Sequence, residues 1–463
     1  MRSPHHLLLS YERIHLMSTA TREAKSISQG IPGSEFTTKG NAIQQFCRFC
    51  LIAFPLLDLF LFRYTFSLFS GPLGYGPFIC MYVLLPFWVL RFRFPVRVAV
   101  TLGLIGLIGS SGVLEGVVES KEFIKVFGSL VLPYIYYWYL WQYFGEDVVR
   151  GFRIYLQGAF IVSAIGLVIF LDNLFPVGVY STLSTFLKMN LTPAAFGIRI
   201  ASTLGEPTYF ANSIAPAGLF SLWRLFFQQS DFDTYLKRQG LWLKRWKAVA
   251  ILLALMLTYS AMALVGLIVS FALILLIKRQ FRTMLFSGCL VLLTLTIARS
   301  VPEIDQRLRG LRDASEVAET SVHGSSAILY NHTVITWENF NRNPWIGTGL
   351  GSHPVATEKY SILGGTTAFA YADQNAKDAS SMFLRIASEL GLFGIILTLF
   401  FLRTHYFKVQ IHDHDGLMLK LISSAFLVTL LLQLFRQGNF ILNGFPFFVY
   451  GYFFAFKKFK SLN

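Results

Sequence analysis

The chain has 463 residues, of which 54% are hydrophobic and only 14% are charged. Repeated apolar runs are long enough to cross the ~30 Å hydrocarbon core of a membrane, which excludes a soluble globular domain and indicates an all-α polytopic membrane protein. The formal net charge is +15. Most of the Lys and Arg residues stand in short loops between apolar runs, where they orient helices, so this charge does not indicate nucleic-acid binding.

A polar segment at 1–45 precedes the first apolar run, and we expect it to be a cytoplasmic tail. The apolar segments that follow lie at roughly 46–62, 72–90, 96–114, 123–144, 152–173, 207–223, 248–277, 283–299, 382–402, 418–435 and 440–456. Each of them is a candidate membrane-spanning helix.

The run at 248–277 would be about 45 Å long as a single helix, against the ~30 Å that a span must cross. Basic residues flank it on both sides, at 244–247 and at 278–282. The positive-inside rule places both flanks in the cytoplasm, so the run must go out and come back. We therefore predict a break near Tyr259, Ser260 and Ala261, and about twelve spans in total.

This topology divides the chain into four parts: the tail at 1–45, spans one to nine at 46–299, a large outward loop at 300–381, and spans ten to twelve with a basic cytoplasmic tail at 382–463. A smaller outward loop lies at 174–206. The two outward loops are the places with room for extracytoplasmic chemistry.

In the smaller loop, Arg199 precedes Glu206 and Pro207, and the proline stands where a helix is predicted to begin. One interpretation is a helix start with an ordinary ion pair. The other is a site in which Arg199 binds a phosphate through forked hydrogen bonds and Glu206 acts as a base or orients a hydroxyl.

The large loop begins with the arginines Arg307, Arg309 and Arg312, which are candidates for binding a pyrophosphate. A helix is then predicted before Pro344, with Ile328, Ile335 and Phe340 on one face, and a tight glycine turn after it.

At the start of the tenth span, Arg385 and Glu389 are four residues apart, so they share a helix face and can pair. Ionisable residues at that depth face a cavity or each other, so both are candidates for substrate binding. Asp58 and Arg436 are further candidates that the sequence does not place relative to the loops.

This arrangement resembles the O-antigen polymerase and O-antigen ligase superfamily, bacterial inner-membrane proteins that handle glycans carried on undecaprenyl diphosphate. The resemblance rests on the topology with its broken seventh run and on three motifs: R-x-x-x-x-x-G-E-P-x-x-x-A (199–211), N-P-x-x-G-x-G-x-G (343–351) and S-x-x-x-x-x-x-x-x-E-x-G-x-x-G (380–394).

The resemblance implies a membrane-embedded glycosyltransferase of the GT-C type, working at the periplasmic face without a metal ion or other cofactor. Its donor would be an undecaprenyl-diphosphate-linked oligosaccharide, and a chain-length regulator would be a possible partner beside the lipid bilayer. Arg199 corresponds to a residue that binds the donor phosphate, and a departing diphosphate gains charge that guanidinium groups stabilise.

Ligases of the superfamily usually carry His-Asn where this chain has Ser380 and Ser381. Many members also carry an arginine at the place of Leu329, close to which His332 stands. The missing histidine favours a polymerase over a ligase, with Glu206 or Asp378 as the base, or no base at all. A ligase remains the alternative, followed by a flippase or other transporter of lipid-linked oligosaccharides, although the polar residues here concentrate in loops on one face.

Overall fold

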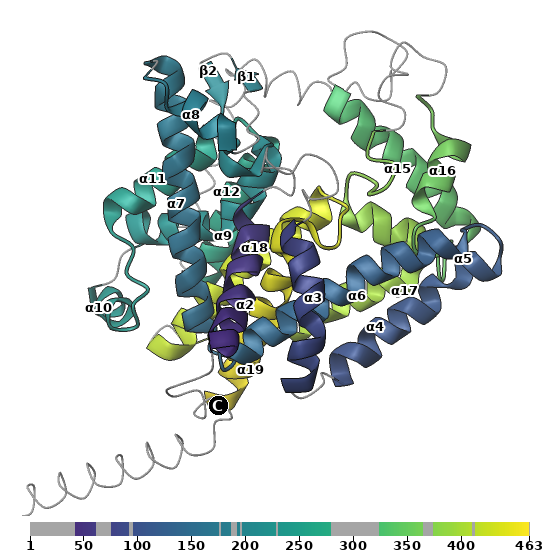
Figure 1. The fold of residues 1–463 in the computed structure, drawn as a ribbon, viewed down its shortest axis with the longest axis horizontal. Helices are drawn as coiled ribbons and strands as arrows, with labels where there is room; N and C mark the ends of the chain where they lie inside the picture. Colours follow the sequence, from purple (N-terminus) through teal and green to yellow (C-terminus); the bar gives the residue numbers. More distant parts are fainter. Residues whose placement is uncertain are drawn as a thin grey trace, which may run out of the picture.

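In the computed structural model, the chain is a bundle of α-helices with a small β-hairpin (Figure 1). The structure describes residues 42–61, 76–91, 96–175, 177–186, 192–194, 197–227, 230–278, 324–363, 374–409 and 413–462. The predicted ninth span (283–299), the arginines Arg307, Arg309 and Arg312, and most of the tail at 1–45 lie outside these residues.

The helices are α2 (Ala42–Phe60), α3 (Gly76–Arg91), α4 (Val96–Gly109), α5 (Ser111–Leu114), α6 (Ser120–Tyr143), α7 (Val148–Leu174), α8 (Val179–Phe186), α9 (Pro207–Phe226), α10 (Ser230–Arg238), α11 (Arg245–Met256), α12 (Ala261–Lys278), α15 (Gly324–Arg342), α16 (His353–Tyr360), α17 (Met382–Thr404), α18 (His414–Phe435) and α19 (Phe445–Leu462). Two short 3₁₀ turns are η4 (Ser202–Leu204) and η7 (Leu442–Gly444). The antiparallel hairpin pairs β1 (Thr192–Ala194) with β2 (Gly197–Arg199).

Helix α18 lies at the centre of the bundle. Its apolar 18-residue window is 89% buried inside the protein, against 28% to 44% for the other helices of spanning length. It packs against α9, α12, α17 and α19, and α9 is likewise buried along most of its length. Because lipid solvates apolar side chains about as well as protein does, the peripheral helices can leave much of their surface to the membrane while the centre is held by close packing.

Six of the described helices are long and apolar enough to cross a membrane, so the chain is a multi-pass membrane protein. Every predicted apolar segment that falls within the described residues coincides with a helix. Several of these helices, such as α3 and α11, are shorter than a full span. The total of twelve spans therefore stays a prediction.

The predicted break in the long apolar run is confirmed. Helix α11 ends at Met256 and α12 begins at Ala261, with Tyr259 between them in a left-handed conformation, φ +46°. The hairpin region completes this junction, because the amide of Ile200 donates to the carbonyl of Leu257 at 3.0 Å. A carbonyl near the end of α11 thus finds a partner in an outward loop rather than in a continuing helix.

Helices α15 and α16 belong to the loop that is predicted to face outward, and they form a layer beside α17, called the outward layer below (Figure 1). The predicted helix before Pro344 is confirmed, and Ile328 and Ile335 are buried as expected. The same face of α15 also buries Asn331, His332 and Asn339, which the apolar periodicity did not reveal.

Helix α17 is broken at Gly391, where φ is 59° and ψ is −153°. The glycine turn packs into this break: the amide of Leu392 donates to the carbonyl of Pro344 at 2.7 Å, and the amide of Gly349 donates to the carbonyl of Glu389 at 3.0 Å. The segment Met382–Leu390 is consequently a short buried helix of its own, next to the outward layer.

The predicted tight glycine turn is confirmed, since Gly347, Gly349 and Gly351 all have positive φ. Close approach adds a second constraint. A Cβ on Gly347 would lie 2.5 Å from the carbonyl carbon of Glu389, and one on Gly391 would lie 2.6 Å from the nitrogen of Gly347. Two backbones therefore meet here at a distance that only glycine permits.

Candidate functional site

A polar cavity of about 110 Å³ opens where four parts of the fold meet. These are the start of α9, the start of α12, the loop before α17 and the end of α18. Its lining consists of Glu206, Thr208, Tyr209, Ser260, Ala261, Met262, Asn375, Asp378, Ser380, Phe435, Arg436 and Gln437. All four parts lie at the ends that the predicted topology faces outward.

Glu206 stands at the N-cap position of α9, directly before Pro207. Its side chain accepts no capping hydrogen bond from the helix, so the carboxylate does not serve as an ordinary helix cap. It is exposed at the cavity, although protein surrounds it on many sides. The loss of bulk water raises the pKa of Glu206 above its usual 4.5, against the lowering effects of the hydroxyls of Thr208 and Tyr209 and of the charges on Arg199 and Arg436.

Arg199 is half-buried at the end of β2. Its Nε donates to the carbonyl of Thr258 at 3.1 Å, which fixes the side chain to the junction between α11 and α12. Its charge acts on Glu206, as the sequence predicted for this pair. Arg199 is not among the residues that line the cavity, but its charge reaches Glu206, which does line it.

The loop before α17 holds Asp378 and Ser380 in a tight turn. The amide of Ser380 donates to Oδ1 of Asp378 at 3.1 Å, and Nδ2 of Asn375 donates to Oγ of Ser380 at 3.0 Å. Burial raises the pKa of Asp378, while the Ser380 amide and the charges of Arg385 and Arg436 lower it, with a net rise. Two carboxylates with raised pKa values therefore line one cavity, a pattern that is common in catalytic sites.

Left-handed backbone conformations concentrate around this cavity. Asn375, Ala379, Ser380 and Gln437 all have positive φ, between 54° and 80°, although none of them is glycine. Such conformations cost roughly 1 to 3 kcal/mol each and persist only where the surrounding structure imposes them. Here they sit on the two loops that form one side of the cavity.

Arg436 follows the last turn of α18 and is half-buried in the cavity wall. The next residues lock its loop onto the loop before α17. The amide of Gln437 donates to the carbonyl of Ser380 at 2.9 Å, and a Cβ on Gly438 would lie only 1.3 Å from the carbonyl oxygen of Asp378. Arg436 and Asp378 are thus placed by one interlocked pair of loops.

Arg385 and Glu389 form the predicted pair on α17, with 3.2 Å between Nε and Oε1. Nη1 of Arg385 also donates to the carbonyl of Gly438 at 3.1 Å, and its guanidinium stacks over the ring of Phe440 at 4.5 Å. Both charged side chains are buried. They therefore support the cavity from behind, through the loop after α18, and neither lines it.

A chain of buried hydrogen bonds supports the loop before α17 from the other side. Nε2 of His332 lies 2.8 Å from the carbonyl of Gln374, and Nδ1 lies 3.0 Å from Nε2 of His353. Nδ1 of His353 lies 3.1 Å from Oγ of Ser388, which accepts a hydrogen bond from Nδ2 of Asn339 at 2.8 Å. The chain thus joins α15, α16 and α17 to the loop.

The direction of this chain follows from its end. A carbonyl oxygen only accepts, so Nε2 of His332 must carry the proton, and its Nδ1 then accepts from Nε2 of His353. Nδ1 of His353 in turn accepts from the hydroxyl of Ser388. Both imidazoles are neutral in this arrangement, in keeping with their burial, which lowers the pKa of His332 and lowers that of His353 well below 6.5.

The structure brings together Glu206, Asp378 and Ser380 in the cavity, with Arg199 beside it. It places His332, Arg385 and Glu389 behind the cavity wall as supports. Arg436, which the sequence named as a candidate but did not place, lines the cavity. The sequence did not single out His353. Its place two residues after the glycine series could have pointed to it.

A family model matches part of the chain. Residues 247–399 match the model of the family described as O-antigen ligase. The match begins in α11 and ends in α17, so it includes the broken run, the glycine turn and the loop that carries Asp378. No curated protein matches the chain. Residues 247–399 are thus similar to the O-antigen ligase family, in agreement with the resemblance that the sequence motifs indicated.

Proposed function

We propose that the protein is a polysaccharide polymerase, which transfers a glycan from undecaprenyl diphosphate onto a second lipid-linked repeat unit at the periplasmic face. The observation that carries this proposal is the meeting of Glu206, Asp378 and Arg436 in one polar cavity at the predicted outward ends of four helices. Together with the family match, this supports a membrane glycosyltransferase of the GT-C type without a metal ion.

The positive charges near the cavity suit the donor. In the proposed reaction, the bond between the anomeric carbon and the diphosphate breaks, and its electron pair leaves with the diphosphate. Guanidinium groups stabilise that growing charge through forked hydrogen bonds. Arg436 lines the cavity and the charge of Arg199 acts on Glu206 within it, so we assign the donor diphosphate to these two residues. Arg307, Arg309 and Arg312 remain candidates for the same role.

We assign the base to Glu206. The attacking acceptor hydroxyl loses a proton as its oxygen forms the new bond to the anomeric carbon, and Glu206 would receive that proton and release it to solvent. Oδ1 of Asp378 already accepts the amide of Ser380, whereas Glu206 makes no cap bond with its helix. Asp378 would then orient the acceptor hydroxyl, with Ser380 beside it in the cavity wall.

The structure around Ser380 and Ser381 favours polymerisation over ligation. Superfamily ligases usually carry His-Asn at these positions. Here Oγ of Ser381 accepts the amide of Leu384 as a helix cap and donates to the carbonyl of Leu434 at 2.7 Å. Ser380 is held by Asn375. Both serines therefore have structural partners, and the nearest imidazole, His332, lies behind the wall with both ring nitrogens engaged.

A deletion strain tests the proposal. If the protein is a polymerase, the strain should accumulate single lipid-linked repeat units and make no long polymer, and the intact gene should restore the polymer. Polymer of normal length in the deletion strain would overturn the proposal. Polymer that forms but stays on its lipid carrier would identify a ligase instead.

A purified preparation separates transfer from transport. A detergent solution has no separate compartments, so a flippase cannot transport its substrate there. A polymerase should still join lipid-linked repeats. Formation of dimers and longer products by the purified full chain would support the enzyme. A preparation that is inactive in detergent but moves lipid-linked repeats across proteoliposomes would support transport.

A further inference from the structure

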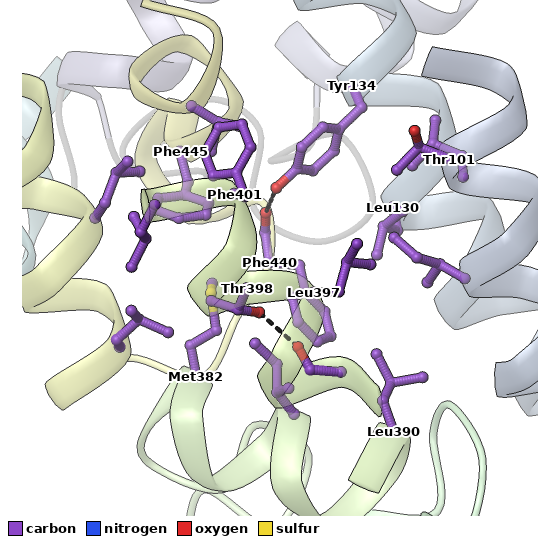
Figure 2. A pocket seen from close by; sticks show the side chains of 18 of the residues that line it. Thr101, Leu130, Tyr134, Met382, Leu390, Leu397, Thr398, Phe401, Phe440 and Phe445 are labelled. Atoms are coloured by element: carbon purple, nitrogen blue, oxygen red, sulfur yellow. Dashed lines mark hydrogen bonds between the residues drawn. The ribbon is translucent and has the colours of Figure 1, made fainter. Parts of the chain in front are cut away.

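A long apolar cavity runs through the bundle between α4, α6, α17 and α19, away from the polar site. One part, of about 230 Å³, lies beneath the glycine turn and is shown in Figure 2. A second part, of about 1010 Å³, continues toward the opposite end of the helices. The two parts share the lining residues Thr101, Leu102, Ile105, Tyr134, Phe401 and Val449, so they adjoin one another.

The walls of this cavity suit a hydrocarbon chain. Most lining residues are aliphatic or aromatic, and several of the polar side chains among them hydrogen-bond to the backbone of the protein. The hydroxyl of Tyr134 donates to the carbonyl of Phe440 at 3.4 Å, and that of Thr398 donates to the carbonyl of Gly394 at 2.8 Å (Figure 2). Oγ1 of Thr101 likewise donates to the carbonyl of Arg97 at 2.9 Å. A polar ligand would lose its hydrogen bonds to water and would find few hydrogen-bond partners in this cavity.

One mouth of the cavity is basic. Arg97, Lys457 and Lys460 line the larger part, and no carboxylate is among its described lining residues. Glu146 neutralises Lys457, with 2.5 Å between Nζ and Oε2, which leaves a net charge of about two units from Arg97 and Lys460, both exposed. The positive-inside rule assigns this mouth to the cytoplasm.

We propose that this cavity binds an anionic phospholipid from the cytoplasmic leaflet, with the headgroup phosphate at Arg97 and Lys460 and an acyl chain between α4, α6, α17 and α19. Basic pockets between membrane helices at the cytoplasmic side are suited to such headgroups. The lining of α19 extends from Lys460 to Phe445, about 22 Å of helix, which exceeds the ~15 Å depth of one leaflet. The cavity is therefore deep enough for the whole chain.

The basic mouth distinguishes this occupant from an isoprenoid tail. A tail that enters from the outward leaflet would carry its diphosphate at the outward end and would have no charged group near Arg97 and Lys460. Ordinary boundary lipid would contact the outer face of α4, which exposes Leu104 and Leu107, rather than the groove between the four helices.

The experiment compares lipids retained by the purified full chain in native mass spectrometry. The probes are phosphatidylglycerol, phosphatidylethanolamine and undecaprenyl phosphate, added in equal amounts. Wild-type protein should retain phosphatidylglycerol preferentially. Replacing Arg97 and Lys460 by Gln should weaken that retention roughly fivefold for each cation removed. The matched control, Lys237→Gln with Arg238→Gln, removes two exposed cytoplasmic cations on α10 and should retain the wild-type preference.

A second pair of variants tests the chain-binding part. Ile105→Trp fills the cavity from α4 and should abolish retention of phosphatidylglycerol, whereas Leu107→Trp, on the exposed face of the same helix, should not. Equal retention by wild type and the double Gln variant would overturn the proposal, since the charges would then select nothing. Preferential retention of undecaprenyl phosphate that is blocked by Ile105→Trp but unaffected by the Gln variants would also overturn it, in favour of an isoprenoid tail.

Discussion

Nδ1 of His332 and Nε2 of His353 lie 3.0 Å apart, so one imidazole holds the other in a fixed tautomer. Because His332 also donates to the carbonyl of Gln374, this contact links the outward helices to the loop that carries Asp378. Neither ring lines the polar cavity, yet the position of its acidic loop depends on both. The two imidazoles therefore support the site, and they can do so only while both are neutral.

This support predicts acid sensitivity. Burial lowers the pKa of both imidazoles in the folded protein, so the unfolded chain binds protons first as the pH falls. Stability should therefore be intact at pH 7.5 and decline below about pH 6.5, the usual pKa of histidine. Thermal unfolding of the purified protein across this range measures the effect.

His353→Gln provides the test of that assignment. It should lower the melting temperature at pH 7.5, because breaking the chain leaves buried polar groups without partners at a cost of about 1 to 3 kcal/mol. It should also flatten the decline at acid pH. His414→Gln, at the start of α18, should keep the wild-type pH dependence. An unchanged acid decline in His353→Gln would assign the sensitivity to other groups.

The raised pKa of Glu206 predicts the acid limb of the activity profile. A general base must be ionised, so transfer by the purified enzyme should fall as the pH drops through a value above 4.5, the usual pKa of glutamate. Glu206→Gln should reduce the rate about 10²- to 10⁴-fold and remove the limb. Asp378→Asn should raise KM and keep the limb. If Asp378→Asn alone removes the limb, the two carboxylates have the opposite roles.

The two arginines should not tolerate lysine. Lysine at position 199 cannot provide the Nε hydrogen bond to Thr258, and at either site an ammonium group lacks the fork that matches a phosphate. Arg199→Lys and Arg436→Lys should each lower polymer formation at least tenfold with normal amounts of protein in the membrane. Arg342→Lys, at the exposed end of α15, is the control and should form normal polymer. Full activity of either site variant would count against forked binding.

Gly438→Ala should disable the site by displacing a loop. The new Cβ would fall 1.3 Å from the carbonyl oxygen of Asp378, so one of the two interlocked loops must move. We expect loss of polymer together with a lower melting temperature. Gly128→Ala on α6 is the matched control, since nothing lies within 4 Å of its Cβ and alanine favours the helix by about 1 kcal/mol. Normal activity in Gly438→Ala would show that the loop position is not critical.

A double-variant cycle separates structural and substrate roles for Arg385 and Glu389. Each single replacement by Met leaves a buried charge without its partner and should cost about 3 to 5 kcal/mol of stability. The double Met variant should recover much of that loss. Single variants with normal melting temperatures but no polymer would instead assign the pair to substrate binding.

The sequence predicted those features that depend on neighbouring residues in the chain. Basic flanks required the run at 248–277 to turn back, and the break was found between Met256 and Ala261. The spacing of Arg385 and Glu389 predicted their pairing, because residues four apart share a helix face. A tight turn at the glycine series was likewise predicted, and the three glycines have positive φ.

The buried polar residues of the outward layer were not predictable from neighbouring residues in the chain. The buried face of α15 is partly polar, so apolar periodicity identified Ile328 and Ile335 but not Asn339 or His332. Those residues are buried because their partners, such as Ser388 and His353, arrive from other helices. A buried hydrogen bond needs two partners. Only one of them lies on α15, so the sequence of α15 alone does not reveal the bond.

The sequence by itself determined the class of protein and the broken run, since these follow from hydropathy and flanking charge, and it predicts that Arg199 and Glu206 face outward. Only the tertiary structure decided which polar residues form the site. It brought Arg436 to Glu206 and Asp378 and left Arg385 and Glu389 as supports behind them. The physical reason is that a cavity is made by the packing of distant segments, and no local pattern encodes the distance between them.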